Sequence, residues 1–188
     1  MLGNLTNTLK KLFGDKAEKD LKELRPYAAK ANEEFKKLSG LSNDELRACT
    51  TRLKKQIADF IREDEQKIEA LKQEAEAAKN ELDKQEALYT EIDDLVKEVD
   101  KKIEEVLLEI LPEAFAVVKE TAKRFAQNDQ VEVTASDYDR ELASAKDNVT
   151  VDGDKAYWAT TWDAFGTEVK WNMIHYDVQL YGGSVLHK

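Results

Sequence analysis

The chain has 188 residues, of which 36% are charged and 41% hydrophobic, with seven glycines, a composition typical of long solvated helices. Its formal net charge of −10 argues against a broad nucleic-acid-binding surface, because such surfaces depend on clustered Lys and Arg. Cys49 is the single cysteine, which excludes an intramolecular disulfide and a multi-cysteine metal site.

The first predicted element is a short amphipathic helix at residues 2–13. Its apolar side chains recur at helical spacing, with Lys10 and Lys11 beside them: Leu2, Leu5, Leu9, Leu12 and Phe13. Such a helix can lie on anionic lipid or dock on the protein itself, and periodicity alone does not separate these interpretations. No apolar run reaches the roughly 20 residues of a membrane span, and no secretory signal core is present, so we expect a cytosolic N-terminus.

A long heptad pattern dominates the middle of the chain. Ser42 and Glu45 have the spacing of a capping box, which predicts that a helix begins there. The predicted apolar seam consists of Ile61, Ile68, Ala75, Leu82, Tyr89, Val96, Ile103 and Ile110, with Leu71, Ala78, Ile92, Val99 and Val106 on the alternate positions. Asp64 and Gln85 interrupt it. One helix cannot bury this seam, so it packs against a second chain or folds back, with residues 79–85 as the predicted tip.

Pro112 marks a change of phase in the apolar pattern. Continuing the heptad would place Glu113, Glu120 and Arg124 in the seam, whereas Phe115, Val118, Ala122 and Phe125 define a new face. We therefore expect Pro112 to be the first residue of a separate helix.

From residue 130 the pattern becomes that of short strands. Alternating segments at 131–134, 149–151 and 156–160 predict strands, and Gly153 lies in a predicted turn at 152–155. Trp158, Trp162 and Trp171 fall in this β-rich region, where we expect them to form part of its core.

Gln179 is the strongest candidate for a binding residue, because an amide side chain can donate to and accept from an adenine edge at the same time. By itself, one glutamine is more often structural. Its setting matters, however: residues 111–125 (LPEAFAVVKETAKRF) and 173–188 (MIHYDVQLYGGSVLHK) together resemble SecA, the ATPase that drives preproteins through the bacterial membrane channel. Residues 11–53 carry a weaker similarity.

The resemblance implies roles for three residues. The family pattern is an aromatic residue, Asp, Val, Gln, Leu, a variable residue and two glycines, and residues 176–183 match it with Tyr176 in the aromatic position. By this resemblance Gln179 reads the adenine of ATP, and Met173 and Tyr176 line the base pocket. The sequence contains no G-x-x-x-x-G-K-[ST] loop, no acidic pair for Mg²⁺ and no arginine finger, so we expect these after Lys188 and no hydrolysis by this stretch alone. Gly182 and Gly183 are predicted as a turn into the next strand.

The predicted fold class is mainly α with a small β-rich unit, in which long helices, arranged as a coiled-coil-like hairpin, lead into the start of a helicase-like α/β nucleotide-binding domain. We divide the chain into an N-terminal helical region (1–52), a heptad helix or hairpin (53–111), a helix of the motor domain (112–126), a β-rich segment (127–171) and the adenine-reading motif (172–188). Relative to the compact SecA pattern, the second and fourth segments are insertions.

The resemblance implies an N-terminal part of a motor that couples ATP hydrolysis to preprotein translocation at the inner face of the cell membrane. Its implied partners are the SecYEG channel, unfolded preproteins and anionic lipid, and it leaves a targeting chaperone and a homodimer open. The alternative is a non-enzymatic coiled-coil adaptor whose heptads form a dimer. A nucleic-acid helicase would also use a glutamine to read adenine, but the net charge disfavours this class of protein.

Overall fold

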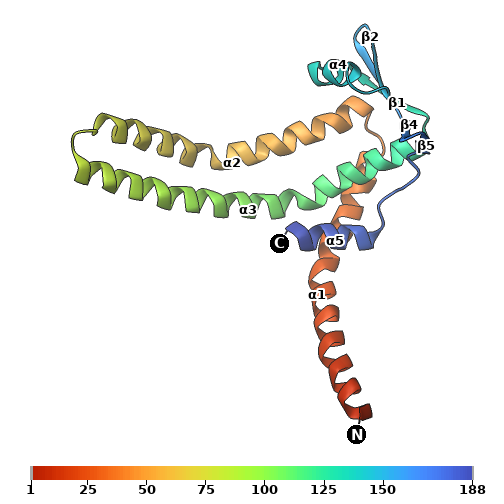
Figure 1. The fold of residues 1–188 in the computed structure, drawn as a ribbon, viewed down its shortest axis with the longest axis horizontal. Helices are drawn as coiled ribbons and strands as arrows, with labels where there is room; N and C mark the ends of the chain where they lie inside the picture. Colours follow the sequence, from red (N-terminus) through yellow and green to blue (C-terminus); the bar gives the residue numbers. More distant parts are fainter. Residues whose placement is uncertain (1, 188) are drawn as a thin grey trace. The chain divides into compact units, whose positions relative to one another are not determined.

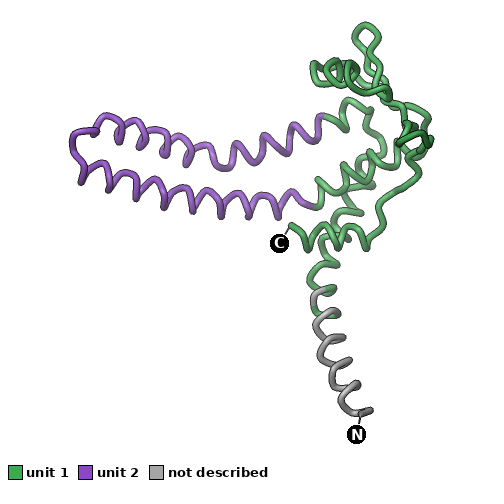
Figure 2. The backbone as a smooth tube through the Cα atoms, in the orientation of Figure 1, with its two compact units in different colours: residues 1–47, 112–188 green, residues 48–111 purple. Residues whose placement is uncertain are grey.

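The computed structural model describes the backbone of residues 2–187 and the side chains of residues 18, 19 and 21–187. It consists of two compact units, one formed by residues 1–47 and 112–188 and the other by residues 48–111 (Figure 2). The elements, all but β3 labelled in Figure 1, are α1 (Leu2–Leu38), α2 (Asn43–Ala77), α3 (Leu82–Gln127), β1 (Gln130–Thr134), α4 (Asp137–Ala143), β2 (Val149–Asp152), β3 (Lys155–Ala159), β4 (Thr161–Ala164), β5 (Thr167–Lys170) and α5 (Asp177–His187). The chain is therefore mostly helical with small antiparallel sheets, as the composition indicates.

The predicted amphipathic stripe at residues 2–13 lies outside the residues whose side chains are described. Its backbone belongs to α1, which is helical from Leu2 to Leu38. Within the described part of the chain, no helix is both long enough and apolar enough to cross a membrane.

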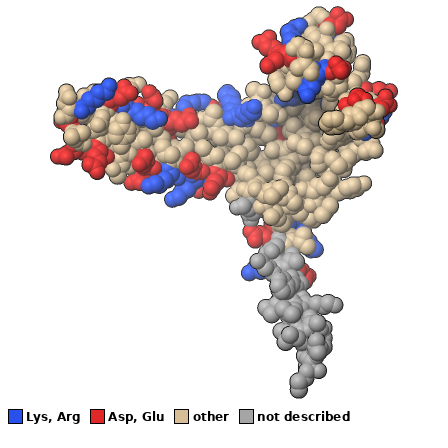
Figure 3. All heavy atoms as spheres, viewed as in Figure 1, with Lys and Arg blue, Asp and Glu red and all other residues tan. Residues whose placement is uncertain are grey.

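The unit of residues 48–111 is a helical hairpin that buries its apolar seam within one chain. The main cluster joins Ile61 and Ile68 of α2 to Ile92 and Val99 of α3. A second cluster near the tip joins Ala75 and Ala78 to Leu88. The turn occupies residues 78–81, at the start of the predicted tip. Of the two packing modes left open by the sequence, the structure adopts folding back. Figure 3 shows side chains of both charges over the visible face of the hairpin.

The heptad prediction is wrong for part of α3. Leu82, Tyr89 and Val96 were expected in the seam but are 76%, 47% and 41% exposed. The seam of α3 instead consists of Leu88, Ile92, Val99 and Val106, together with partly buried Leu95 and Ile103. The turn at residues 78–81 ends one helix and starts another, so the phase of the first helix does not continue into the second.

The two polar interruptions of the seam both find partners inside the hairpin. Asp64 of α2 accepts a hydrogen bond from Lys102 Nζ of α3 at 2.5 Å, and this bond raises the pKa of Lys102. Gln85 Nε2 donates to the carbonyl oxygen of Ala75 at 3.0 Å, near the end of α2, where main-chain carbonyls lack helical partners. Both interruptions therefore link the two helices.

Pro112 does not begin a helix, because α3 runs through it from Leu82 to Gln127. A proline inside a helix removes one main-chain donor, at a cost of about 3 kcal/mol. Buried apolar residues lie directly on both sides of it: Ile110, Leu111, Ala116 and Val117. We attribute the continuation of the helix to the burial of these flanking residues, which offsets the lost hydrogen bond.

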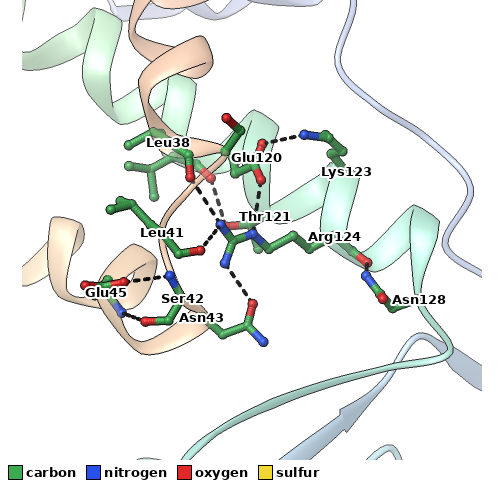
Figure 4. A network of polar contacts seen from close by, with 12 residues as sticks. Leu38, Leu41, Ser42, Asn43, Glu45, Glu120, Thr121, Lys123, Arg124 and Asn128 are labelled. Atoms are coloured by element: carbon green, nitrogen blue, oxygen red, sulfur yellow. Dashed lines mark hydrogen bonds and ion pairs between the residues drawn. The ribbon is translucent and has the colours of Figure 1, made fainter.

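The other unit is organised around Arg124 of α3, a role that the predicted apolar face gave no sign of (Figure 4). Its guanidinium donates to Glu120 Oε1 at 3.1 Å, Asn43 Oδ1 at 2.8 Å and the carbonyl oxygens of Leu38 and Leu41 at 3.2 and 2.7 Å. These bonds join the end of α1 and the start of α2 to α3. Glu120 is 2% exposed, whereas Val118, a member of the predicted face, is 53% exposed.

The start of α2 has the predicted capping box. Glu45 N–H donates to Ser42 Oγ at 3.2 Å, and Ser42 N–H donates to a carboxylate oxygen of Glu45 at 2.7 Å. These bonds lower the pKa of Glu45, with the bond from the Ser42 main chain as the largest cause. Hydrogen bonding of both side chains thus defines where the helix begins.

The β-rich region contains a three-stranded antiparallel sheet in the order β1-β3-β2 and a separate hairpin of β4 and β5. The three predicted strands are confirmed, as is the turn between β2 and β3, where Gly153 has a φ of 59°. The pattern analysis missed α4 and the β4–β5 hairpin. Trp158, Trp162 and Trp171 are partly buried rather than core residues.

Polar side chains attach this region to α2. Asp44 accepts from the main chain and the hydroxyl of Thr134 at 2.9 and 2.7 Å. Arg47 forms a two-pronged ion pair with the fully buried Asp139 of α4, at 2.6 and 2.8 Å. This pair, aided by bonds from Ser136 and Trp158, lowers the pKa of Asp139 despite the opposing effect of burial.

Candidate functional site

The three predicted adenine-site residues lie together at the start of α5. The main-chain N–H of Tyr176 donates to Gln179 Oε1 at 2.8 Å, and the main-chain N–H of Gln179 donates back to the Tyr176 carbonyl at 2.9 Å. Gln179 Nε2 lies 3.4 Å from Met173 Sδ. The glutamine therefore closes the first turn of the helix in the manner of the third residue of a capping box.

This geometry leaves Gln179 able to bind a base. Its amide oxygen has a second lone pair, and its NH₂ group has a second hydrogen besides the one directed at the weak sulfur acceptor. Gln179 and Tyr176 are exposed, and Met173 is half-buried. An adenine edge offers one donor and one acceptor, which is the complement that a free amide group requires.

Close packing against α1 and α3 holds α5 in position. Leu180 lies in a buried cluster with Ala28 and Ala31 of α1, and Phe115 of α3 packs against it. A Cβ at Gly183 would lie 2.9 Å from the tip of the Phe115 ring. The predicted turn at Gly182 and Gly183 is thus wrong: both lie inside α5, and Gly183 allows the helix to approach α3 closely.

A polar link fixes the first residue of α5 to both neighbouring helices. Asn32 of α1 donates to Asp177 Oδ1 at 2.8 Å and accepts from Lys119 Nζ of α3 at 2.8 Å. Lys119 also lies over the ring of Phe35, 5.3 Å from its centroid. Asp177 is acidic at a helix N-terminus, where the helix dipole favours a negative charge. Sequence reasoning missed this link, because Asn32 and Asp177 are 145 residues apart in the chain.

The segment before α5 is fixed from the β-rich region. The main-chain N–H of Trp171 donates to the carbonyl of Thr160 at 2.8 Å, and its indole donates to the carbonyl of Met173 at 2.7 Å. Thr160 is fully buried and its hydroxyl donates to the carbonyl of Asn128 at 2.8 Å, just after α3. The position of Met173 is therefore fixed by the hydrogen bond to its main-chain carbonyl as well as by the contacts of its side chain.

Comparison with known proteins finds a family match that includes the residues of the candidate site. The family model for the SecA DEAD-like domain covers residues 9–188. The chain belongs to the SecA family. It is 50% identical over 184 residues, 98% of its length, to the protein translocase subunit SecA of Flavobacterium psychrophilum, and 47% identical over 178 residues to that of Parabacteroides distasonis. A SecA of Phocaeicola vulgatus is 50% identical over 179 residues. No solved structure matches.

The chain spans 16% of the length of these SecA relatives. Their alignments cover 95 to 98% of it, so they run through the helical hairpin and the β-rich region as well as through α5. The two segments predicted as insertions are thus shared with SecA proteins of these organisms. No group of three or more His, Cys, Asp or Glu side chains suited to a metal ion is found among the described residues.

Proposed function

We propose that this chain is the N-terminal part of a SecA-type motor that couples ATP binding and hydrolysis to the translocation of unfolded preproteins. The observation that carries the proposal is the arrangement of Gln179, Tyr176 and Met173 around the first turn of α5. In this role Gln179 reads the adenine through its amide, and Tyr176 and Met173 line the base pocket. When bound, ATP supplies the phosphoryl group whose transfer to water drives the motor.

The residues of this chain contribute recognition rather than phosphoryl chemistry. The sequence holds no phosphate loop, so in this proposal the groups that bind the phosphates and Mg²⁺ come from parts of a SecA-type protein other than residues 1–188. We expect no hydrolysis by residues 1–188 alone. The link from Asn32 and Lys119 to Asp177 keeps the helix that carries Gln179 in one orientation, which limits the entropy lost when the base binds.

The remaining partners follow from family membership and are proposals for the whole protein. They are the SecYEG channel, unfolded preproteins and an anionic membrane surface, with a targeting chaperone and a homodimer as further candidates. We propose a cytoplasmic protein that associates peripherally with the membrane through the basic amphipathic stripe of residues 2–13. The adaptor alternative loses its main argument, because the hairpin buries its seam without a second chain.

The test is substitution of Gln179 in the whole protein that contains this chain. Gln179→Ala removes the amide and should weaken ATP binding by about tenfold, since a base-edge hydrogen-bond pair contributes on the order of 1–3 kcal/mol. It should also reduce the preference for ATP over GTP, measured as the ratio of their dissociation constants.

A second variant separates base recognition from helix capping. Gln179→Glu keeps an oxygen that can accept from the Tyr176 N–H but loses the amide donor. If Gln179 reads the base, Gln179→Glu loses ATP affinity while α5 stays formed. Gln66→Ala, at an exposed glutamine of the hairpin, is the matched control and should bind ATP normally. Unchanged affinity and base preference in both Gln179 variants would sink the assigned role.

A further inference from the structure

The hairpin part of α3 carries two apolar rows, of which only one is buried. The inner row packs against α2 and includes Ile92 and Val99. The outer row consists of Leu82, Tyr89 and Val96, which are 76%, 47% and 41% exposed. Members of the outer row are seven residues apart, so they lie on one side of the helix along about 21 Å. The hairpin fold leaves this second row unpartnered.

Exposure to solvent alone does not explain why Tyr and Val occupy these helix positions. Tyr and Val form helix less readily than Ala, Glu or Lys, which serve better at solvated helix positions. Tyr89 and Val96 therefore weaken the helix slightly without contributing to the seam. An apolar row at heptad spacing is typical of a surface that packs against another helix.

A row of carboxylates runs beside the outer row. Glu86, Asp93 and Asp100 each follow an outer-row residue by four positions, so each lies next to that residue on the helix surface. All three are exposed. Among the described residues none of the three forms a salt bridge; the nearby Lys97 pairs with Asp94 at 2.9 Å, and its charge also interacts with that of Asp93. The surface is thus an apolar stripe with an acidic border.

This border decides which occupant fits. A second copy of the hairpin would bring two acidic borders together, and like charges across a helix interface repel. An anionic membrane would repel the same carboxylates. A helix with an apolar stripe and a lysine or arginine border could pack its stripe against the outer row and pair its charges with the carboxylates. Flanking charges select partners in coiled coils in the same way.

We propose that the outer row and its acidic border, residues 82–100 of α3, form a docking surface for a basic amphipathic helix of a partner protein. The surface is independent of the adenine site. The hairpin then serves as an arm whose inner row maintains its own fold and whose outer row holds the partner.

The test uses the full chain and a synthetic helical peptide of about three heptads with Leu at the seam positions and Lys at the flanking positions. Fluorescence anisotropy measures its binding at physiological ionic strength. A peptide of the same composition in scrambled order reports general attraction to an acidic protein. We expect the heptad peptide to bind at least about tenfold more tightly than the scrambled one.

Variants then locate the binding. The double variant Tyr89→Glu/Val96→Glu should lower the affinity for the heptad peptide about tenfold or more, because the apolar contact is lost and a carboxylate enters the stripe. Phe60→Glu is the matched control, since Phe60 is a 48% exposed aromatic on the other helix of the hairpin, and it should bind normally. Circular dichroism checks that both variants keep their helix content.

Charge reversal tests the acidic border. Glu86→Lys/Asp93→Lys/Asp100→Lys should turn the preference toward a peptide with Glu in place of Lys. The proposal is overturned if the scrambled peptide binds equally well, or if Phe60→Glu lowers binding as much as the double variant does. It is also overturned if the double variant abolishes self-association in sedimentation, or binding to anionic phosphatidylglycerol vesicles, instead of peptide binding.

Discussion

The two compact units are stabilised in different ways. The hairpin of residues 48–111 rests on an apolar seam, and polar links such as the pair of Asp64 and Lys102 join its two helices beside that seam. The unit of residues 1–47 and 112–188 adds to its apolar cluster polar side chains that bond to main-chain carbonyls or to buried carboxylates. Arg124 and Arg47 are the principal examples.

The difference shows in how each unit resists change. The stability that an apolar seam provides is proportional to its buried apolar area. This contribution is spread over many residues, so each one can be replaced at a moderate cost in stability. A buried ion pair concentrates its effect in two side chains, because removing one leaves the other charged and out of water. We therefore expect single substitutions to lower the free energy of unfolding most at the buried ion pairs of residues 1–47 and 112–188, and less in the hairpin.

The largest effect is expected at Arg124. Arg124→Met keeps much of the side-chain volume but leaves the 2% exposed Glu120 without its guanidinium and removes the donors to Leu38 and Leu41. Loss of one partner of a buried ion pair costs about 3–5 kcal/mol, and we expect the lower end of that range because Lys123 still pairs with Glu120 Oε2 at 3.2 Å. Urea denaturation followed by circular dichroism should report a loss of this size in the free energy of unfolding.

The control for this change is a lysine in an exposed pair. Lys97→Met removes the partner of Asp94, and both side chains are 69% exposed, so we expect no measurable loss of stability. If Arg124→Met and Lys97→Met were equally mild, the polar network in Figure 4 would not be what stabilises this unit.

A smaller effect is expected in the hairpin seam. Ile92→Ala removes buried methyl groups that contact the Ile61 and Ile68 cluster and should cost about 2–4 kcal/mol. Val96→Ala, one helical turn away but 41% exposed, should change stability by less than about 0.5 kcal/mol. Hydrogen exchange of the hairpin amides measures both. Equal protection in the two variants would contradict the assignment of the inner row as the seam.

The same contrast explains which parts of the fold could be predicted from the sequence. Periodicity predicted a long helical seam and three strands, because these patterns depend on neighbours along the chain, but it left open whether the seam pairs with a second chain or folds back. The phase of the seam in α3 was wrong, since both apolar rows have heptad spacing and only packing against α2 separates them. The roles of Arg124 and Arg47 depend on residues more than 80 positions away, which no local pattern reveals.

The role of the candidate site stays a prediction, and the contacts that support it carried no sequence signal. The pattern around Gln179 indicated the three residues that meet at the start of α5. No sequence pattern indicated that Asn32 and Lys119 support the site, because Asn and Lys are common on a helix surface. Ser136 and Asp139, by contrast, have capping-box spacing, so the start of α4 could have been recognised.

The smallest predicted effect distinguishes the two adjacent glycines of α5. Gly182→Ala meets nothing within 4 Å, so it should stabilise the chain by about 0.5–1 kcal/mol through the better helix propensity of alanine. Gly183→Ala gains the same propensity, but its Cβ overlaps the ring of Phe115, and overpacking costs about 1–3 kcal/mol. Thermal unfolding should therefore shift in opposite directions for the two variants. Adding Phe115→Leu removes the ring atoms that the new methyl group meets, so in that background Gly183→Ala should behave like Gly182→Ala. If it still destabilises there, the close approach of α5 to α3 is not the reason for the glycine.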